Sequence, residues 1–176
     1  PFRITAPGDI KGGRYLSNVT RLDVRSSGST VSASGGGISP SFAVSGAVLR
    51  PLTYDAAALQ ALPTSTHTVG ANSYSGVSLW TLLNTDAGLK PDNSTHNPSI
   101  RMYAVATGSD GYKAVVTLGE IDPGFGNQPA LIATSLNGAP LGNHGVARLV
   151  LPKDLKASRS VSNLVAIEVF VAPVAP

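Results

Sequence analysis

The sequence predicts a folded α+β protein that is mostly β, with a few short helices. The 176 residues are 42% hydrophobic and 13% charged, which supports a buried core. They include 19 glycines and 13 prolines, which favour many turns and short strands. Several short segments alternate apolar and polar residues with the period of a strand, whereas only two short segments show a helical pattern.

The first 25 residues are a diverged copy of residues 146–170, aligned without a gap. The shared positions form a polar, irregular frame, unlike the apolar alternation that unrelated strands have in common. Self-similarity over a whole strand–turn–strand stretch indicates a duplicated structural unit. The identical pairs are Arg3 and Arg148, Pro7 and Pro152, Asp9 and Asp154, Lys11 and Lys156, Arg14 and Arg159, Ser17 and Ser162, Asn18 and Asn163, and Val24 and Val169.

Both copies cannot fill one place in one domain. We therefore interpret residues 1–25 as the closing segment of a preceding repeat. We expect them to pack on the body of their own domain or on a neighbouring copy, by strand addition or end-to-end contact. A head-to-tail contact that does not close would build a fibre.

A Gly/Ser-rich stretch at 26–40 follows, and its composition is typical of a linker or flexible loop. The main domain is expected at 41–176. Its first strand is predicted around Phe42 and Val44, which alternate with smaller residues.

Two short helices are predicted next. Thr53 is the expected N-cap of the first, which ends at Pro63. Ser78 is the expected cap of the second, whose leucines form an apolar face that ends at Gly88.

The rest of the chain predicts strands separated by turn-rich loops. Asp110-Gly111 marks a turn between two of the strands, and Asn137-Gly138 is a strong hairpin signal. Loops are expected at 89–99, 119–129 and 153–160, and strands within 100–108, 110–118, 130–136, 147–152 and 163–171.

Composition excludes several classes of function. The chain has no cysteine, so it forms no disulfide, no Cys-ligated metal site and no thiol nucleophile. Its histidines lack metal-ligand spacing, and no nucleophile motif is present, so we expect no metal site and no catalytic residues. The bases behind the net charge of +3 are scattered, which argues against a nucleic-acid partner. No apolar run approaches the roughly 20 residues of a membrane span.

Five segments, in order, resemble the molybdopterin-binding domain of sulfite-oxidase-type oxidoreductases, especially the short bacterial versions of that family. They are residues 76–83, 109–121, 130–141, 144–154 and 159–169. The likeness covers about residues 41–171. It implies an α+β, mostly β fold with mixed sheets, in which loops line a groove for the pterin and its phosphate.

In that family a Cys thiolate coordinates molybdenum. The matching interval here, residues 66–77, is short and has no cysteine, so oxo-transfer chemistry is not expected. The resemblance places His144, Arg148, Lys156 and Arg159 at or beside the positions that contact the cofactor. However, the duplicated copy keeps Arg3, Lys11 and Arg14 without a complete domain around it, which favours a structural role for these bases.

These observations predict a non-catalytic, self-assembling structural module with no resident cofactor, whose N-terminal segment contacts other copies head to tail. The low charge and abundant small residues favour a secreted or cell-surface bacterial protein. One alternative is a protein that binds a pterin or another phosphorylated small molecule near His144 and Arg148 without redox activity. The other is a remote oxidoreductase with a ligand set that lacks cysteine.

Overall fold

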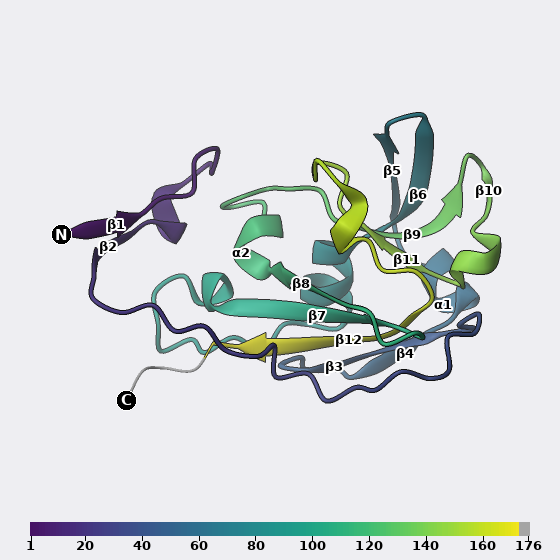
Figure 1. Cartoon of the computed structure of the whole chain (residues 1–176), viewed down its shortest axis with the longest axis horizontal. Coiled ribbons are helices and arrows are strands. Elements are labelled where there is room, and N and C mark those ends of the chain that lie inside the picture. The colour runs from purple at the N-terminus through teal and green to yellow at the C-terminus, as the bar shows by residue number, and fades with distance from the viewer. Residues whose placement is uncertain (173–176) are drawn as a thin grey trace.

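The computed structural model describes residues 1–172, and two five-stranded sheets build its main body (Figure 1). The first sheet has the order β4-β3-β12-β7-β8. Its central strand β12 pairs parallel with β3 and antiparallel with β7, so the sheet is mixed. Its strands are β3 (Phe42–Gly46), β4 (Leu52–Tyr54), β7 (Met102–Gly108), β8 (Lys113–Thr117) and β12 (Leu164–Val171).

The second sheet is antiparallel, with the order β10-β9-β6-β5 and with β11 also paired to β9. The predicted hairpin turn is present, because Asn137 and Gly138 both have positive φ, at 52° and 80°. Its strands are β5 (Thr64–Val69), β6 (Asn72–Ser78), β9 (Leu131–Leu136), β10 (Ala139–Pro140) and β11 (Arg148–Val150).

Both predicted helices form, with corrections to their details. Thr53 lies in β4, and the N-cap of α1 (Ala56–Gln60) is Asp55, whose carboxylate accepts from the Ala58 amide at 2.9 Å. The Ser78 hydroxyl accepts from the Thr81 amide at 3.4 Å, and the following turn η2 (Thr81–Asp86) is π-helical. Its leucines are buried as expected.

Other short helical turns lie in loops. The segment expected as a loop at 119–129 begins inside a one-turn helix, α2 (Leu118–Ile121). This prediction was wrong at its start because the turn is too short to show a periodic pattern. The remaining turns are η3 (Pro98–Arg101), η4 (Gly142–His144) and η5 (Ala157–Arg159).

A single large core joins the two sheets. Strand β12 contributes Leu164 and Ile167, which are almost fully buried, and the second sheet contributes Ile132 and Leu149. The last two predicted strands, β11 and β12, therefore close the core. The predicted class, mostly β with mixed sheets and a few short helices, is confirmed.

Residues 1–19 form a separate small unit beside α2, at the far end of the molecule from the β5–β6 hairpin (Figure 1). It consists of β1 (Phe2–Ile4), the turn η1 (Gly12–Arg14) and β2 (Leu16–Val19). Within residues 1–172, strands β1 and β2 pair only with each other.

The Gly/Ser-rich stretch has no helix or strand, and it follows the first sheet (Figure 1). The hydroxyl of Tyr103 donates to the Ser27 carbonyl at 3.2 Å, and Lys113 donates to the Ser29 hydroxyl at 2.9 Å. The Ser34 amide donates to the Ser109 carbonyl at 2.8 Å. Hydrogen bonds to β7, β8 and the turn between them thus hold this stretch against the sheet.

Within residues 1–172, no helix has the length and apolar character needed to cross a bilayer.

Candidate functional site

Residues 1–19 and 146–164 share one local fold, although the first segment lies outside the body and the second closes its core. In both, an extended lysine precedes a short 3-10 turn: Lys11 has φ −132° and ψ 147°, and Lys156 has φ −134° and ψ 146°. Asn18 and Asn163, at matching positions, are both left-handed, with φ of 55° and 51°. The repeated sequence is a repeated structure.

The strand contacts of the two segments also match. Ile4 pairs with Leu16 across β1 and β2. At the same two positions of the second copy, Leu149 pairs with Val161. The register is therefore the same in both copies, as a duplicated strand–turn–strand unit requires.

Each copy is tied by an Asp–Arg pair across its turn. Arg14 donates through Nε to Asp9 at 2.7 Å and through Nη2 to the other carboxylate oxygen. Arg159 donates to Asp154 in the same way, at 2.8 and 2.6 Å. Because these bidentate pairs lie within the turn, each segment can hold its local shape without the rest of a domain.

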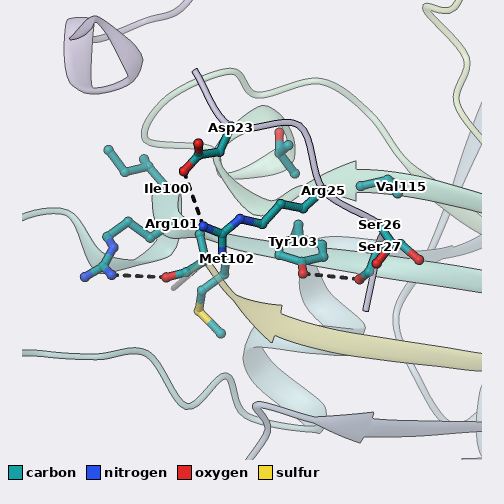
Figure 2. A pocket seen from close by; sticks show the side chains of 11 residues that line it. Asp23, Arg25, Ser26, Ser27, Ile100, Arg101, Met102, Tyr103 and Val115 are labelled. Atoms are coloured by element: carbon teal, nitrogen blue, oxygen red, sulfur yellow. Dashed lines mark hydrogen bonds and ion pairs between the residues drawn. The ribbon is translucent and has the colours of Figure 1, made fainter. Parts of the chain in front are cut away.

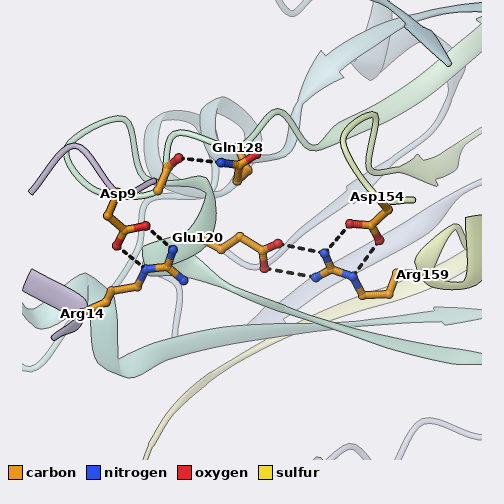
Figure 3. Close-up of polar contacts among 7 residues, drawn as sticks. Asp9, Arg14, Glu120, Gln128, Asp154 and Arg159 are labelled. Carbon is orange, nitrogen blue, oxygen red and sulfur yellow. Dashed lines mark hydrogen bonds and ion pairs between the residues drawn. The ribbon is translucent and has the colours of Figure 1, made fainter. Parts of the chain in front are cut away.

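Glu120 of α2 lies between the two copies (Figure 3). Its two carboxylate oxygens accept from Nη2 and Nη1 of Arg159, at 2.8 and 3.1 Å. Arg14 lies on the other side, and a Cβ on Gly119 would be only 2.9 Å from the Arg14 Cδ. Helix α2 is thus the point at which the N-terminal copy meets the body.

The loop after α2 completes this contact. The Ile10 amide donates to the Phe125 carbonyl at 2.8 Å. The Phe125 ring also lies so close to Gly13 that a Cβ there would be 2.2 Å from it. The N-terminal segment therefore does touch its own body, through a narrow surface.

The ion pairs shift the pKa of three groups, and that of Arg14 is raised by its hydrogen bond to Asp9. The hydrogen bond from Arg14, together with its positive charge, lowers the pKa of Asp9 although burial opposes this. Hydrogen bonds to Glu120 and then to Asp154 raise the pKa of Arg159. These directions favour the charged forms, as expected for groups that stabilise structure.

The two copies differ in what covers their apolar side chains. In the C-terminal copy these side chains belong to the core, whereas in the N-terminal copy they face solvent. The exposed fraction is 84% for Phe2 and 0% for its counterpart Ala147, 77% for Leu22 and 1% for Ile167, and 98% for Val24 and 1% for Val169.

The four predicted cofactor residues are spread over separate contacts. Arg159 is paired with Glu120 and Asp154, as described above. His144 shares a 3.1 Å hydrogen bond with Ser162, and the Arg148 guanidinium lies 5.8 Å from the centre of the Tyr74 ring. Lys156 is exposed, and the Nε of Arg148 is buried without a hydrogen-bond partner.

No hydrogen bond or ion pair between any two of these four residues occurs within residues 1–172. The same part of the chain contains no cluster of three or more His, Asp or Glu residues that could hold a metal ion.

The interval that the resemblance assigns to the metal ligand forms a tight hairpin. Strands β5 and β6 pair from Thr64 with Val77 to Val69 with Asn72, so only Gly70 and Ala71 connect them. This arrangement leaves no loop to carry a ligand, and the chain has no cysteine to supply a thiolate. The residues present therefore do not fit a molybdenum ligand of that type.

A groove of about 710 Å³ lies between residues 23–27 and β7 and β8 (Figure 2). Its two arginines bind neighbouring groups, Arg25 to Asp23 at 3.3 Å and Arg101 to the Ala172 carbonyl at 3.1 Å. The groove is a seam between the N-terminal stretch and the sheet, and none of the four predicted cofactor residues lines it.

The fold is similar to that in the crystal structure of the sulfane dehydrogenase SoxCD from Paracoccus pantotrophus. The TM-score is 0.57 at 21% sequence identity, and the match covers 74% of this chain and 38% of that chain. No protein-family model and no curated protein matches the sequence. At this identity the likeness concerns the fold, and it confirms the predicted sulfite-oxidase-like fold.

The sequence did not predict the role of Glu120, which lies in the segment expected as a loop at 119–129. Its position 39 residues before Arg159 gives no periodic signal. The one feature that sets Glu120 apart in the sequence is its rarity, because the chain has only two glutamates.

Proposed function

We propose that this chain is a non-catalytic structural module, exported from the cell, that contacts a neighbouring unit through residues 1–25. The observation that carries the proposal is that residues 1–19 hold the same local fold as 146–164, while residues 1–25 expose apolar positions that the other copy buries.

The energetics support a missing contact. Full burial of a Val or Leu side chain contributes about 1.5–3 kcal/mol. Leu22 and Val24 are both largely exposed, and so is Phe2. A neighbouring surface that covered all three would stabilise the association by several such increments, whereas this body covers none of them.

The contacts of the polar residues that the two copies share support a structural role for these residues. Arg14 and Arg159 are each committed to an aspartate within their own turn. Arg159 also binds Glu120 with both terminal nitrogens. A phosphate would have to compete with these carboxylates for the same donors.

Light scattering tests the proposal. If the neighbouring unit is another intact copy, the mass of the full chain rises with concentration, while a variant without residues 1–25 stays monomeric. The substitutions Leu22→Asp and Val24→Asp in the full chain serve as a control that keeps chain length, and they should also give a monomer. A full chain that remains monomeric across the concentration range contradicts contact between intact copies through residues 1–25.

Metal analysis and mass spectrometry test the alternative in which the chain binds a phosphorylated small molecule. We expect the purified protein to carry neither molybdenum nor a pterin. The alternative is supported most strongly by Nε of Arg148, which lies beside Tyr74 and has no hydrogen-bond partner within residues 1–172. A pterin released in a one-to-one ratio, and lost in Arg148→Met but not in Arg3→Met, would establish that alternative.

A further inference from the structure

We infer that residues 1–25 close a second domain of this same fold, by inserting between its strands as residues 146–170 insert between those of this body. The inference rests on the proposed function and names its partner: a body of this fold that lacks strands of its own equivalent to β11 and β12. An intact copy of this chain does not qualify, because residues 146–170 already fill that place.

The C-terminal copy shows what would cover the exposed side chains. Val169 pairs with Gly46 of β3 and with Ala104 of β7, and it points into the core. Val24 is its counterpart in the repeat. In the partner, Val24 would therefore lie between strands equivalent to β3 and β7.

Residues 20–25 have the alternation that such a position needs. Leu22 and Val24 correspond to inward-facing residues of β12. Asp23 and Arg25 correspond to the half-buried Glu168 and Phe170 of β12 and form an ion pair with each other. Arg21, which also pairs with Asp23, takes the place of Ala166, which is buried in this body. A strand with one apolar face and one polar face fits a sheet that packs on the core with one face. In this chain, however, the segment forms no strand.

The contacts of Arg14 point to the same partner. Among the described residues Arg14 donates to Asp9 alone, whereas its counterpart Arg159 donates to both Asp154 and Glu120. A second body would supply the missing acceptor from its own equivalent of α2.

Two positions indicate that the partner body differs in sequence. The first is Arg21, which takes the place of the buried Ala166. Phe2 takes the place of Ala147, which is fully buried in this body. A phenylalanine needs a larger recess there. The partner is therefore a diverged domain of the same fold with more space at this site.

The test joins a second body to the full chain. Residues 26–145 are placed directly before Pro1, and Phe2→Ala and Arg21→Ala are included so that the segment fits this body. Hydrogen exchange of residues 16–25 should be slower by at least about a hundredfold than in the unfused chain with the same substitutions, because insertion buries and pairs these amides.

Two matched fusions decide the result. In the first, residues 146–170 replace residues 1–25, which shows that the added body folds when its native segment closes it. In the second, Leu22→Asp and Val24→Asp should abolish the protection. The inference is overturned if residues 161–170 are protected in the first matched fusion but residues 16–25 are not protected in the test fusion. It is also overturned if residues 16–25 stay protected in the second matched fusion, which carries the two aspartates.

The unfused chain separates this inference from the proposed function. If residues 16–25 gain protection as the concentration of the intact 176-residue chain rises, units contact each other without an open body. That result supports the proposed function and overturns insertion. Protection confined to the fusion supports insertion, and absence of protection in both contradicts insertion and contact between copies alike.

Discussion

Arg159 donates a hydrogen bond to each carboxylate oxygen of Glu120, at 2.8 and 3.1 Å. The pair joins the turn before β12 to α2, and the Glu120 side chain is only 18% exposed. Because α2 also receives Arg14 and the adjacent loop receives Ile10, this carboxylate organises the surface on which the N-terminal copy rests.

We predict that Glu120→Gln lowers the free energy of unfolding by about 1–2 kcal/mol, since it removes a charge-assisted, partly shielded pair. Urea denaturation measures the change. Glu168→Gln is the control, because Glu168 forms no ion pair within residues 1–172. Equal effects of the two substitutions would contradict the role given to Glu120.

The left-handed asparagines give a comparison between the two copies. Asn163→Ala should lower the stability of the body by about 1–2 kcal/mol, because alanine is strained at a φ of 51°. Asn18→Ala introduces the same strain outside the core, so global unfolding should change by less than about 0.5 kcal/mol. Denaturation midpoints of the two variants test this, and Asn163→Gly should recover the backbone part of the loss.

The stability of the turn in the N-terminal copy should depend on pH, because the Asp9 carboxylate accepts the hydrogen bonds that hold it. Its pKa is lowered in the folded turn, so the stabilisation is present above the ordinary carboxyl pKa and is lost as pH falls through the lower, folded value. Below about pH 4 the protection factor of the Tyr15 amide, which donates to the Gly12 carbonyl at 2.9 Å, should therefore fall. Asp9→Asn should remove this pH dependence, and NMR-detected exchange between pH 5 and 2 provides the measurement.

Alanine substitutions at two glycines with positive φ should distinguish the cost of backbone strain from the cost of a steric clash. At Gly46 a Cβ would lie 2.1 Å from the Val169 carbonyl oxygen, whereas at Gly70 nothing lies within 4 Å. Gly70→Ala should cost about 1 kcal/mol through φ alone. Gly46→Ala should cost at least about 2 kcal/mol more, because β3 must move away from β12. A difference below about 1 kcal/mol in thermal or urea unfolding would contradict this account.

The sequence predicted the elements whose signals are local. The Asn137-Gly138 turn needs only two residues that accept positive φ, and the strand of Ile167 and Val169 needs only their alternation with Glu168 and Phe170. The Asp154–Arg159 pair, by contrast, appeared in the sequence only as a basic loop. Side-chain partners depend on three-dimensional proximity, which one chain without relatives does not reveal.

The sequence also predicted only part of the candidate site. The repeat was visible in the sequence, and so was the absence of a thiolate ligand in the interval that became the β5–β6 hairpin. That Glu120 binds Arg159 was not visible, since the two residues are distant along the chain. The family resemblance suggested cofactor contacts for bases that here bind carboxylates or an aromatic ring.

By itself, the sequence determined that residues 1–25 repeat 146–170 and form the same turn, because the bonds that hold the turn, such as Arg14 to Asp9, lie within the segment. Only the tertiary structure decided that one copy closes a core while the other leaves Leu22 and Val24 exposed. Burial depends on the surfaces that other parts of the chain bring together, so two segments built around the same turn can have opposite surroundings.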